Sequence, residues 1–204
     1  MNTTFQGSDG ETRCYWCEAT QEYIDYHDDE WGFPVSDDFH LFEKLSLESF
    51  QSGLSWRTIL VKRENFRTAF DKFDFNIVAD YAEKEVEHLL NDEGIVRHRG
   101  KIEATINNAK VAQKLVKEHG SLAAFLWQYE PKVQLSVDTE VASTSEESIA
   151  LSKDLKKLGW KFLGPTTAYA FMQSVGMVND HFVSCVTQSK VESARKSFKR
   201  PSAK

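Results

Sequence analysis

The strongest constraint on the fold is a segment that predicts two helices joined by a tight hairpin. Thr144 and Glu147 have the spacing of a capping box, which marks a helix start. Three leucines then recur on one helical face: Leu151, Leu155 and Leu158. Gly159 is expected to end this first helix, because glycine adopts the left-handed conformation of a helix C-terminus without steric cost.

The second helix of this segment is predicted to follow the hairpin Gly159-Trp-Lys-Phe-Leu-Gly164, since proline is favoured at a first helical position and Pro165 comes next. Its inward residues would be Ala168, Phe171, Met172 and Val175, with Gly176 at its end. A hairpin of this kind exposes backbone N–H groups at the positive end of a helix, and these can bind a phosphate. An ordinary helical hairpin packed in the core fits the same residues equally well.

Helical periodicity also dominates the rest of the chain. After Ser36, one stripe recurs at three- and four-residue steps and comprises Phe39, Phe42, Leu45, Ser49 and Phe50. Helices are predicted over 37–50, 55–72, 84–90, 97–118 and 121–127. Only short β-like runs such as Val133–Val137 remain, too few for a sheet, so the predicted class is all-α.

The net charge of −6 argues at first against a nucleic-acid partner. The charge is unevenly distributed, however. Residues 1–50 contain twelve carboxylates, whereas most charged side chains in residues 190–204 are basic. A local basic face remains open. For the tail alone, a solvated and frayed end is the preferred interpretation.

Sequence composition also indicates the cellular compartment of the protein. No apolar run approaches the roughly 20 residues of a membrane span, and Met1–Glu11 lacks the basic start and apolar core of a leader. Three cysteines are too few for a disulfide framework, and an odd number indicates reduced thiols or metal ligands. We therefore expect a cytoplasmic protein.

A zinc site is one use of these cysteines. His181 and Cys185 are four residues apart on one helical face, and Cys14 with His27 would complete a tetrahedral set. From spacing alone, a core histidine and two buried thiols are the more common outcome.

The first fifty-six residues are unusually aromatic, and the rings are Tyr15, Trp16, Tyr23, Tyr26, Trp31, Phe33, Phe50 and Trp56. Flat apolar walls beside an acid suit an enzyme that binds an extruded base. Glu48, at a helix end that runs into a glycine turn, is the candidate acid. Core packing is the usual fate of such rings, and a lone glutamate is more often on the surface.

Several separate motifs, taken together, resemble those of bacterial 3-methyladenine DNA glycosylase I, from Arg13 to Cys185. They are Arg13-Cys14-x-Trp16, Tyr26-His-Asp-x-Glu-Trp-Gly32, Leu47-Glu48, Gly53-Leu-Ser-Trp56, Lys62-Arg-Glu-Asn65, Gly94-Ile-Val-Arg-His-Arg-Gly-Lys-Ile102, and Asn179-Asp-His181 with Cys185. Their order and spacing make the resemblance specific.

The resemblance implies a helix-hairpin-helix DNA glycosylase fold. Residues 13–187 would form the glycosylase domain, 1–12 a flexible extension and 188–204 a basic, disordered tail. The hairpin region, 149–176, would bind DNA through Gly159, Lys161 and Gly164. A structural zinc ion held by Cys14, His27, His181 and Cys185 would join the N- and C-terminal segments, with Cys17 outside the set.

For the pocket, the resemblance implies that Glu48 reads the base and supplies electrostatic stabilisation. Tyr26 and Trp56 correspond most directly to base-binding residues of the family, and Trp16 and Tyr23 would form further walls of the pocket. Leu54 would be the wedge that fills the gap left by the flipped nucleotide. Family members commonly have glycine directly after the pocket glutamate, whereas Ser49 stands here.

The implied activity is hydrolytic excision of 3-methyladenine from alkylated double-stranded DNA by a monomer. Related enzymes that also cut the strand carry a lysine two residues after the last hairpin glycine, where this chain has Thr166, so a monofunctional enzyme is expected. Asp180 is given no catalytic role. Two alternatives are a non-catalytic DNA-damage binding protein and a zinc-stabilised helical interaction module.

Overall fold

The computed structural model describes residues 3–133, 137 and 140–202, and the described part is mainly helical. Its helices are α1 (Gln21–Asp29), α2 (Asp38–Gln51), α3 (Trp56–Leu60), α4 (Arg63–Ala69), α5 (Phe75–Val78), α6 (Glu83–Asn91), α7 (Arg99–His119), α8 (Leu122–Leu126), α9 (Glu146–Lys157), α10 (Pro165–Ser174) and α11 (Val186–Ser197). Two strands, β1 (Thr4–Gln6) and β2 (Thr12–Cys14), pair antiparallel. Short 3-10 turns cover Tyr15–Cys17, Asp71–Phe73 and Trp127–Tyr129.

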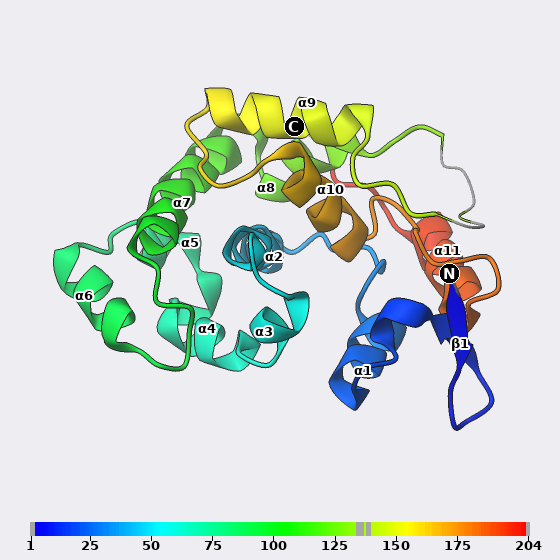
Figure 1. The fold of residues 1–204 in the computed structure, drawn as a ribbon. Helices are drawn as coiled ribbons and strands as arrows, with labels where there is room; N and C mark the ends of the chain where they lie inside the picture. The colour runs from blue at the N-terminus through cyan, green and yellow to red at the C-terminus, as the bar shows by residue number, and fades with distance from the viewer. Residues whose placement is uncertain (1–2, 134–136, 138–139, 203–204) are drawn as a thin grey trace.

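Helix α2 runs through the centre of the molecule (Figure 1). It contacts α3, α7, α8 and α10, and α9 packs on α10. A second group, made of α1, the β1–β2 hairpin and α11, lies to one side of this helical body (Figure 1). Strand β2 contacts α11, so the two ends of the chain meet in this second group.

The central position of α2 changes its burial pattern from the one-sided stripe that the sequence predicts. Every residue from Leu41 to Phe50 is buried, whereas Phe39, predicted to face inward, is 37% exposed. Three charged side chains are therefore buried within this helix: Glu43, Lys44 and Glu48. Glu43 pairs with Arg67 and Lys44 pairs with Glu30, which offsets the cost of removing their charges from water.

The predicted helical hairpin is present as α9, a turn and α10. Pro165 is the first residue of α10, and its predicted inward residues are all fully buried: Ala168, Phe171, Met172 and Val175. The start of α9 differs from the prediction, because Ser145 and Ser148 form the capping box in place of Thr144 and Glu147. Leu158, the third leucine of the predicted face, is 41% exposed, and α9 ends one residue before it.

The helices predicted over 37–50, 84–90, 97–118 and 121–127 correspond to α2, α6, α7 and α8. The continuous helix predicted over 55–72 is wrong. It breaks into α3 and α4, and then Asp71, Lys72 and Phe73 have positive φ angles of 47°, 55° and 56°. This left-handed turn directs Phe73 into the core, where its ring stacks on Phe70 at a centroid distance of 5.5 Å. Tertiary packing thus overrides the local periodicity.

Both ends of the chain are more ordered than the sequence predicts. Residues 4–6 pair with 12–14, so the extension 1–12 is not uniformly flexible. Residues 186–197 form α11 and are not a disordered tail; Val191 and Arg195 are buried against the rest of the chain. In the predicted β-like run Val133–Val137, residues 134–136 lie outside the described residues, and Val137 forms an isolated bridge with Phe182.

Gly176 joins the hairpin to the segment that follows α1. A Cβ at this position would lie 2.5 Å from the Gly32 carbonyl oxygen and 2.7 Å from the Pro34 nitrogen, so only glycine allows this approach. The Val35 amide donates to the Val175 carbonyl nearby, at 3.3 Å. This contact fixes α10 beside Trp31. None of the helices in the described ranges is long and apolar enough to cross a membrane.

Candidate active site

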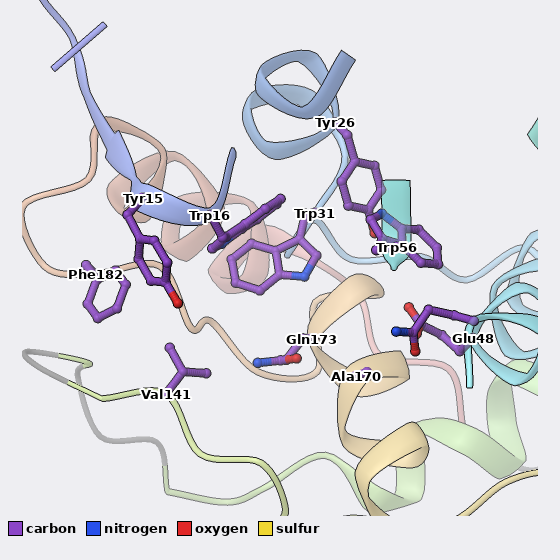
Figure 2. Close-up of a pocket in the computed structure, with 11 residues that line it drawn as sticks. Tyr15, Trp16, Tyr26, Trp31, Glu48, Trp56, Val141, Ala170, Gln173 and Phe182 are labelled. Carbon is purple, nitrogen blue, oxygen red and sulfur yellow. The ribbon is translucent and has the colours of Figure 1, made fainter. Parts of the chain in front are cut away.

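A cavity of about 300 Å³ opens between the central helix, the hairpin helix α10 and the aromatic N-terminal group (Figure 2). Its volume is at the lower end of the range for pockets that hold a small molecule. Aromatic rings form most of the wall, with one carboxyl and two amides as polar groups. The lining residues are Tyr15, Trp16, Tyr26, Trp31, Glu48, Gln51, Trp56, Val141, Ala170, Gln173 and Phe182.

Glu48 is the acid of this cavity. It lies one turn before the end of α2 and is only 5% exposed. Burial raises its pKa to about 8, because the charged carboxylate loses hydration; the charge of Lys44, one turn earlier in α2, lowers the pKa only in part. With this pKa, Glu48 is largely protonated at neutral pH.

A buried ion-pair network lies beside Glu48 and Tyr26. Lys44 donates to Glu30, and Arg63 also donates to Glu30, at 2.6 Å. Burial acts to raise the pKa of Glu30, but these two cations lower it to about 2. The Lys44 Nζ atom also lies 5.2 Å from the centre of the Tyr26 ring. The network thus holds one aromatic wall of the cavity in place.

The aromatic walls contact one another. Tyr26, at the end of α1, and Trp56, the first residue of α3, have ring centroids 5.5 Å apart at an angle of 42°. Trp16 meets Trp31 edge to face at 5.1 Å. The Nε1 atom of Trp56 is buried and has no hydrogen-bond partner among the described residues. The Trp56 ring lines the cavity, whereas this nitrogen is out of reach of solvent.

The structure brings Glu48, Tyr26, Trp56 and Trp16 together at the cavity, as the sequence predicts. Tyr23 is the exception, because it does not line the cavity and packs edge-on against Trp16 at 5.8 Å. It is therefore a support for a wall residue and not a wall itself.

Leu54 lies on a loop beside the cavity and is 39% exposed. The loop is held by backbone contacts, since the Leu54 amide donates to the Gln51 carbonyl at 2.7 Å and the Gln51 side chain donates to the Leu54 carbonyl at 2.8 Å. The buried Lys101 ammonium donates to the carbonyls of Phe50 and Ser52 at 2.9 and 2.7 Å. An apolar side chain is thus exposed on a restrained loop.

The hairpin between α9 and α10 is also firmly held. Asn108 of α7 accepts from the Lys161 amide at 2.8 Å and donates to its carbonyl at 3.0 Å, which leaves the lysine side chain exposed. Gly159 has a φ of +94°, and a Cβ built on Gly164 meets nothing within 4 Å. The first amides of α10 after Pro165 have no partner within the helix, as at any helix start.

Three of the four predicted metal ligands converge. Ligand atoms of Cys14, His27 and Cys185 all lie within 4.8 Å of one another, and all three residues are buried. A hydrogen bond from the Cys14 thiol and then the His27 ring lower the pKa of the Cys185 thiol, against the effect of burial. Cys17 instead donates its thiol to the Cys14 carbonyl, at 3.1 Å.

His181 is next to this cluster and is not within the 4.8 Å group. Its ring centroid is 4.8 Å from that of His27, and its Nδ1 atom is 3.0 Å from the Asn179 side-chain oxygen. Its Nε2 atom is buried without a partner among the described residues. Metal-binding histidines commonly donate one ring N–H to an oxygen atom and leave the other nitrogen free for the metal, and the His181 ring has this arrangement.

Sequence reasoning missed several lining residues. Trp31 and Tyr15 were visible only as members of an aromatic cluster, with nothing to separate wall from core. Gln51, one turn after Glu48, could have been found from helical spacing. Ala170 and Gln173 are brought to the cavity by α10, whose position relative to α2 no local signal predicts.

Comparison with known proteins agrees with this geometry. Residues 16–188 match the model of a family described as methyladenine glycosylase. The chain belongs to the methyladenine glycosylase family. It is 46% identical over 177 residues to DNA-3-methyladenine glycosylase 1 of Escherichia coli (strain K12), which covers 85% of this chain and 95% of that one.

Other methyladenine glycosylases are similarly close. The DNA-3-methyladenine glycosylase of Haemophilus influenzae is 44% identical over 178 residues, covering 85% of this chain and 96% of that protein. A solved structure of 3-methyladenine DNA glycosylase I from Staphylococcus aureus, which addresses 3-methyladenine recognition, has a TM-score of 0.83 and 36% identity. The match covers 86% of this chain and 96% of that one.

Proposed function

We propose that this chain is a monofunctional DNA glycosylase that flips 3-methyladenine out of alkylated double-stranded DNA and hydrolyses its N-glycosidic bond. The observation that carries the proposal is the buried, partner-poor Glu48 carboxyl in a cavity walled by aromatic rings. The named activity of the relatives supports the same substrate. The proposal includes action as a monomer.

The chemistry follows from the charge of the lesion. Methylation at N3 gives adenine a formal positive charge, which weakens the glycosidic bond before the enzyme acts. When this cation enters the cavity, its charge favours the ionised form of Glu48 and lowers a pKa of about 8. The carboxylate then stabilises positive charge on the base and on the oxocarbenium-like sugar until water attacks.

The aromatic walls hold the flipped base. Trp56 stacks on the base, Tyr26 and Trp16 enclose it, and Glu48 with Tyr26 reads its edge. Leu54 fills the space that the base leaves in the duplex. Its exposure on a loop fixed by Gln51 and Lys101 supports this role, because a wedge must be rigid to replace a stacked base.

The hairpin binds the DNA backbone. The first amides of α10 and the exposed Lys161 side chain contact phosphates, and Gly164 leaves room for the backbone to approach. Thr166 offers no amine, so no Schiff base forms and the strand is not cut.

A structural zinc ion joins the two ends of the chain. Cys14, His27 and Cys185 supply three ligands and the unpaired Nε2 of His181 supplies the fourth. Two thiolates and two imidazoles suit Zn²⁺, and such a set leaves no position for a catalytic water. The ion would restrain β2, α1 and the segment before α11, which together carry several wall residues of the cavity.

The test is release of the base. The protein is incubated with methylated duplex DNA, and the freed bases are identified by chromatography. We expect 3-methyladenine in the released fraction and no strand cleavage beyond that of the abasic product. Binding to methylated DNA without any released base would overturn the proposal in favour of a non-catalytic DNA-damage binding protein.

A further inference from the structure

Gln173 presents a fixed hydrogen-bond acceptor to the base cavity. It lies on α10 one turn after Ala170, and both residues line the cavity. Figure 2 shows the Gln173 side chain below Trp31, with its amide oxygen toward the side of Glu48 and its nitrogen on the opposite side. The orientation of this amide decides whether the base meets an acceptor or a donor.

Asp180 fixes that orientation. Its Oδ2 atom accepts from the Gln173 Nε2 at 2.8 Å and from the Tyr169 hydroxyl at 2.8 Å. Asp180 and Tyr169 are 7% and 6% exposed, so water competes little for these bonds. An oxygen that accepts two hydrogen bonds can face only the NH₂ end of a glutamine, because the opposite orientation would place two acceptors together. The amide oxygen of Gln173 must therefore be the end left for the cavity.

The two purines differ at the position such an acceptor would read. Adenine carries an exocyclic amine at C6, which donates, whereas guanine carries a carbonyl oxygen there, which only accepts. Glu48, the carboxyl that lines the same cavity, is also an acceptor once ionised. A guanine-derived base would place its O6 against the Gln173 oxygen and the ionised Glu48, two acceptors that cannot donate to it.

We infer that Gln173, held by Asp180, is a specificity-determining residue that selects 3-methyladenine over 3-methylguanine by accepting a hydrogen bond from the exocyclic amine. Gln173 touches the base, and Asp180 acts through Gln173 as a positioning residue. The inference rests on the proposed function, because it concerns the base that the same cavity binds.

The experiment compares excision of 3-methyladenine and 3-methylguanine from the same methylated duplex by the wild type and three variants. Gln173→Leu removes the acceptor at similar size and should lower the preference for 3-methyladenine about tenfold, the effect of one net hydrogen bond. Asp180→Asn keeps the shape but can face Gln173 with either end of its amide. The preference should then fall at least about threefold, since the glutamine is no longer fixed.

Tyr169→Phe is the matched control. It removes the other hydrogen bond to the same Asp180 oxygen and leaves the bond to Gln173 intact. The preference should therefore stay at the wild-type value. A fall in Tyr169→Phe as large as in Asp180→Asn would overturn the inference, because it would show general loosening of α10. An unchanged preference in Gln173→Leu would also overturn it, and this variant decides the question if Asp180→Asn does not fold.

A second readout does not need catalysis. Quenching of the cavity tryptophans by free 3-methyladenine and by free 3-methylguanine gives the two affinities for each protein. We expect the same order of preference as in excision, with metal content and melting temperature alike in all four proteins. Wild-type protein that releases no base would refute the proposed function, whereas equal base affinities in the wild type and Gln173→Leu would refute this inference alone.

Discussion

Replacement of Glu48 by glutamine should stabilise the protein in a pH-dependent way. The carboxyl is 5% exposed, and its pKa rises from an ordinary value of 4.5 to about 8 on folding because burial disfavours the charge. One pKa unit corresponds to about 1.4 kcal/mol, so the ionised side chain destabilises the folded state by about 5 kcal/mol at most. Glutamine has nearly the same shape and carries no charge.

The sign of the effect follows from proton binding. Because the folded state holds the Glu48 proton more tightly, the wild type keeps its full stability below the unfolded pKa of 4.5. It loses stability as pH rises to about 8, and the loss is constant above that. Glu48→Gln lacks this loss. The variant should therefore match the wild type near pH 4.5 and exceed its free energy of unfolding by several kcal/mol at pH 9.

Urea unfolding of both proteins at pH 5 and pH 9 measures this difference, and the titration of all other shared groups cancels between them. Glu43→Gln is the control on the same helix, since Glu43 is buried but bonded to Arg67 at 3.0 Å. Its loss of an ion pair should destabilise the protein at pH 9. If the gain from Glu48→Gln is the same at both pH values, the assigned burial of a lone carboxyl is wrong. In single-turnover assays Glu48→Gln should excise 3-methyladenine more slowly than the wild type, with little change in affinity for abasic DNA.

Three further outcomes are expected. Elemental analysis should find about one zinc per chain, chelation should lower the melting temperature, and Cys17→Ser should keep the metal; purified protein without zinc would refute the site. Gly164→Leu, whose Cβ would meet no atom of the chain within 4 Å, should weaken binding to abasic and intact duplexes alike and leave stability unchanged. Fluorescence anisotropy and thermal melting measure these two effects, and wild-type affinity would refute the hairpin role. Trp56→Ala should weaken binding of free 3-methyladenine by about 1–3 kcal/mol in a direct titration, and an unchanged affinity would remove Trp56 from the base site.

The helical hairpin and most of the central helices could be predicted from the sequence because their signals are short-range. Pro165 begins α10, Gly159 carries a positive φ, and the four predicted inward residues of α10 are buried. The recurrent motifs around Glu48 and Trp56 similarly indicated the family and the pocket. Caps, turns and helical periodicity act within about one or two turns, so a chain displays them before it folds.

Other features depend on contacts between distant segments. Cys14 and Cys185 meet only because β2 packs beside α11, and Gln173 reaches the cavity only because Gly176 lets α10 approach the segment after α1. The break in 55–72 arises because Phe73 gains more from the core than a continued helix would give it.

The sequence by itself determined which residue types are available: a carboxyl at 48, aromatic rings around it, and two cysteines and two histidines at the ends. The tertiary structure alone decided that Glu48 is buried with no ion-pair partner among the described residues, that its pKa rises to about 8, and that Asp180 turns the Gln173 oxygen toward the cavity. Burial and hydrogen-bond partners set the charge and direction of a side chain, and both depend on neighbours that are far away along the chain.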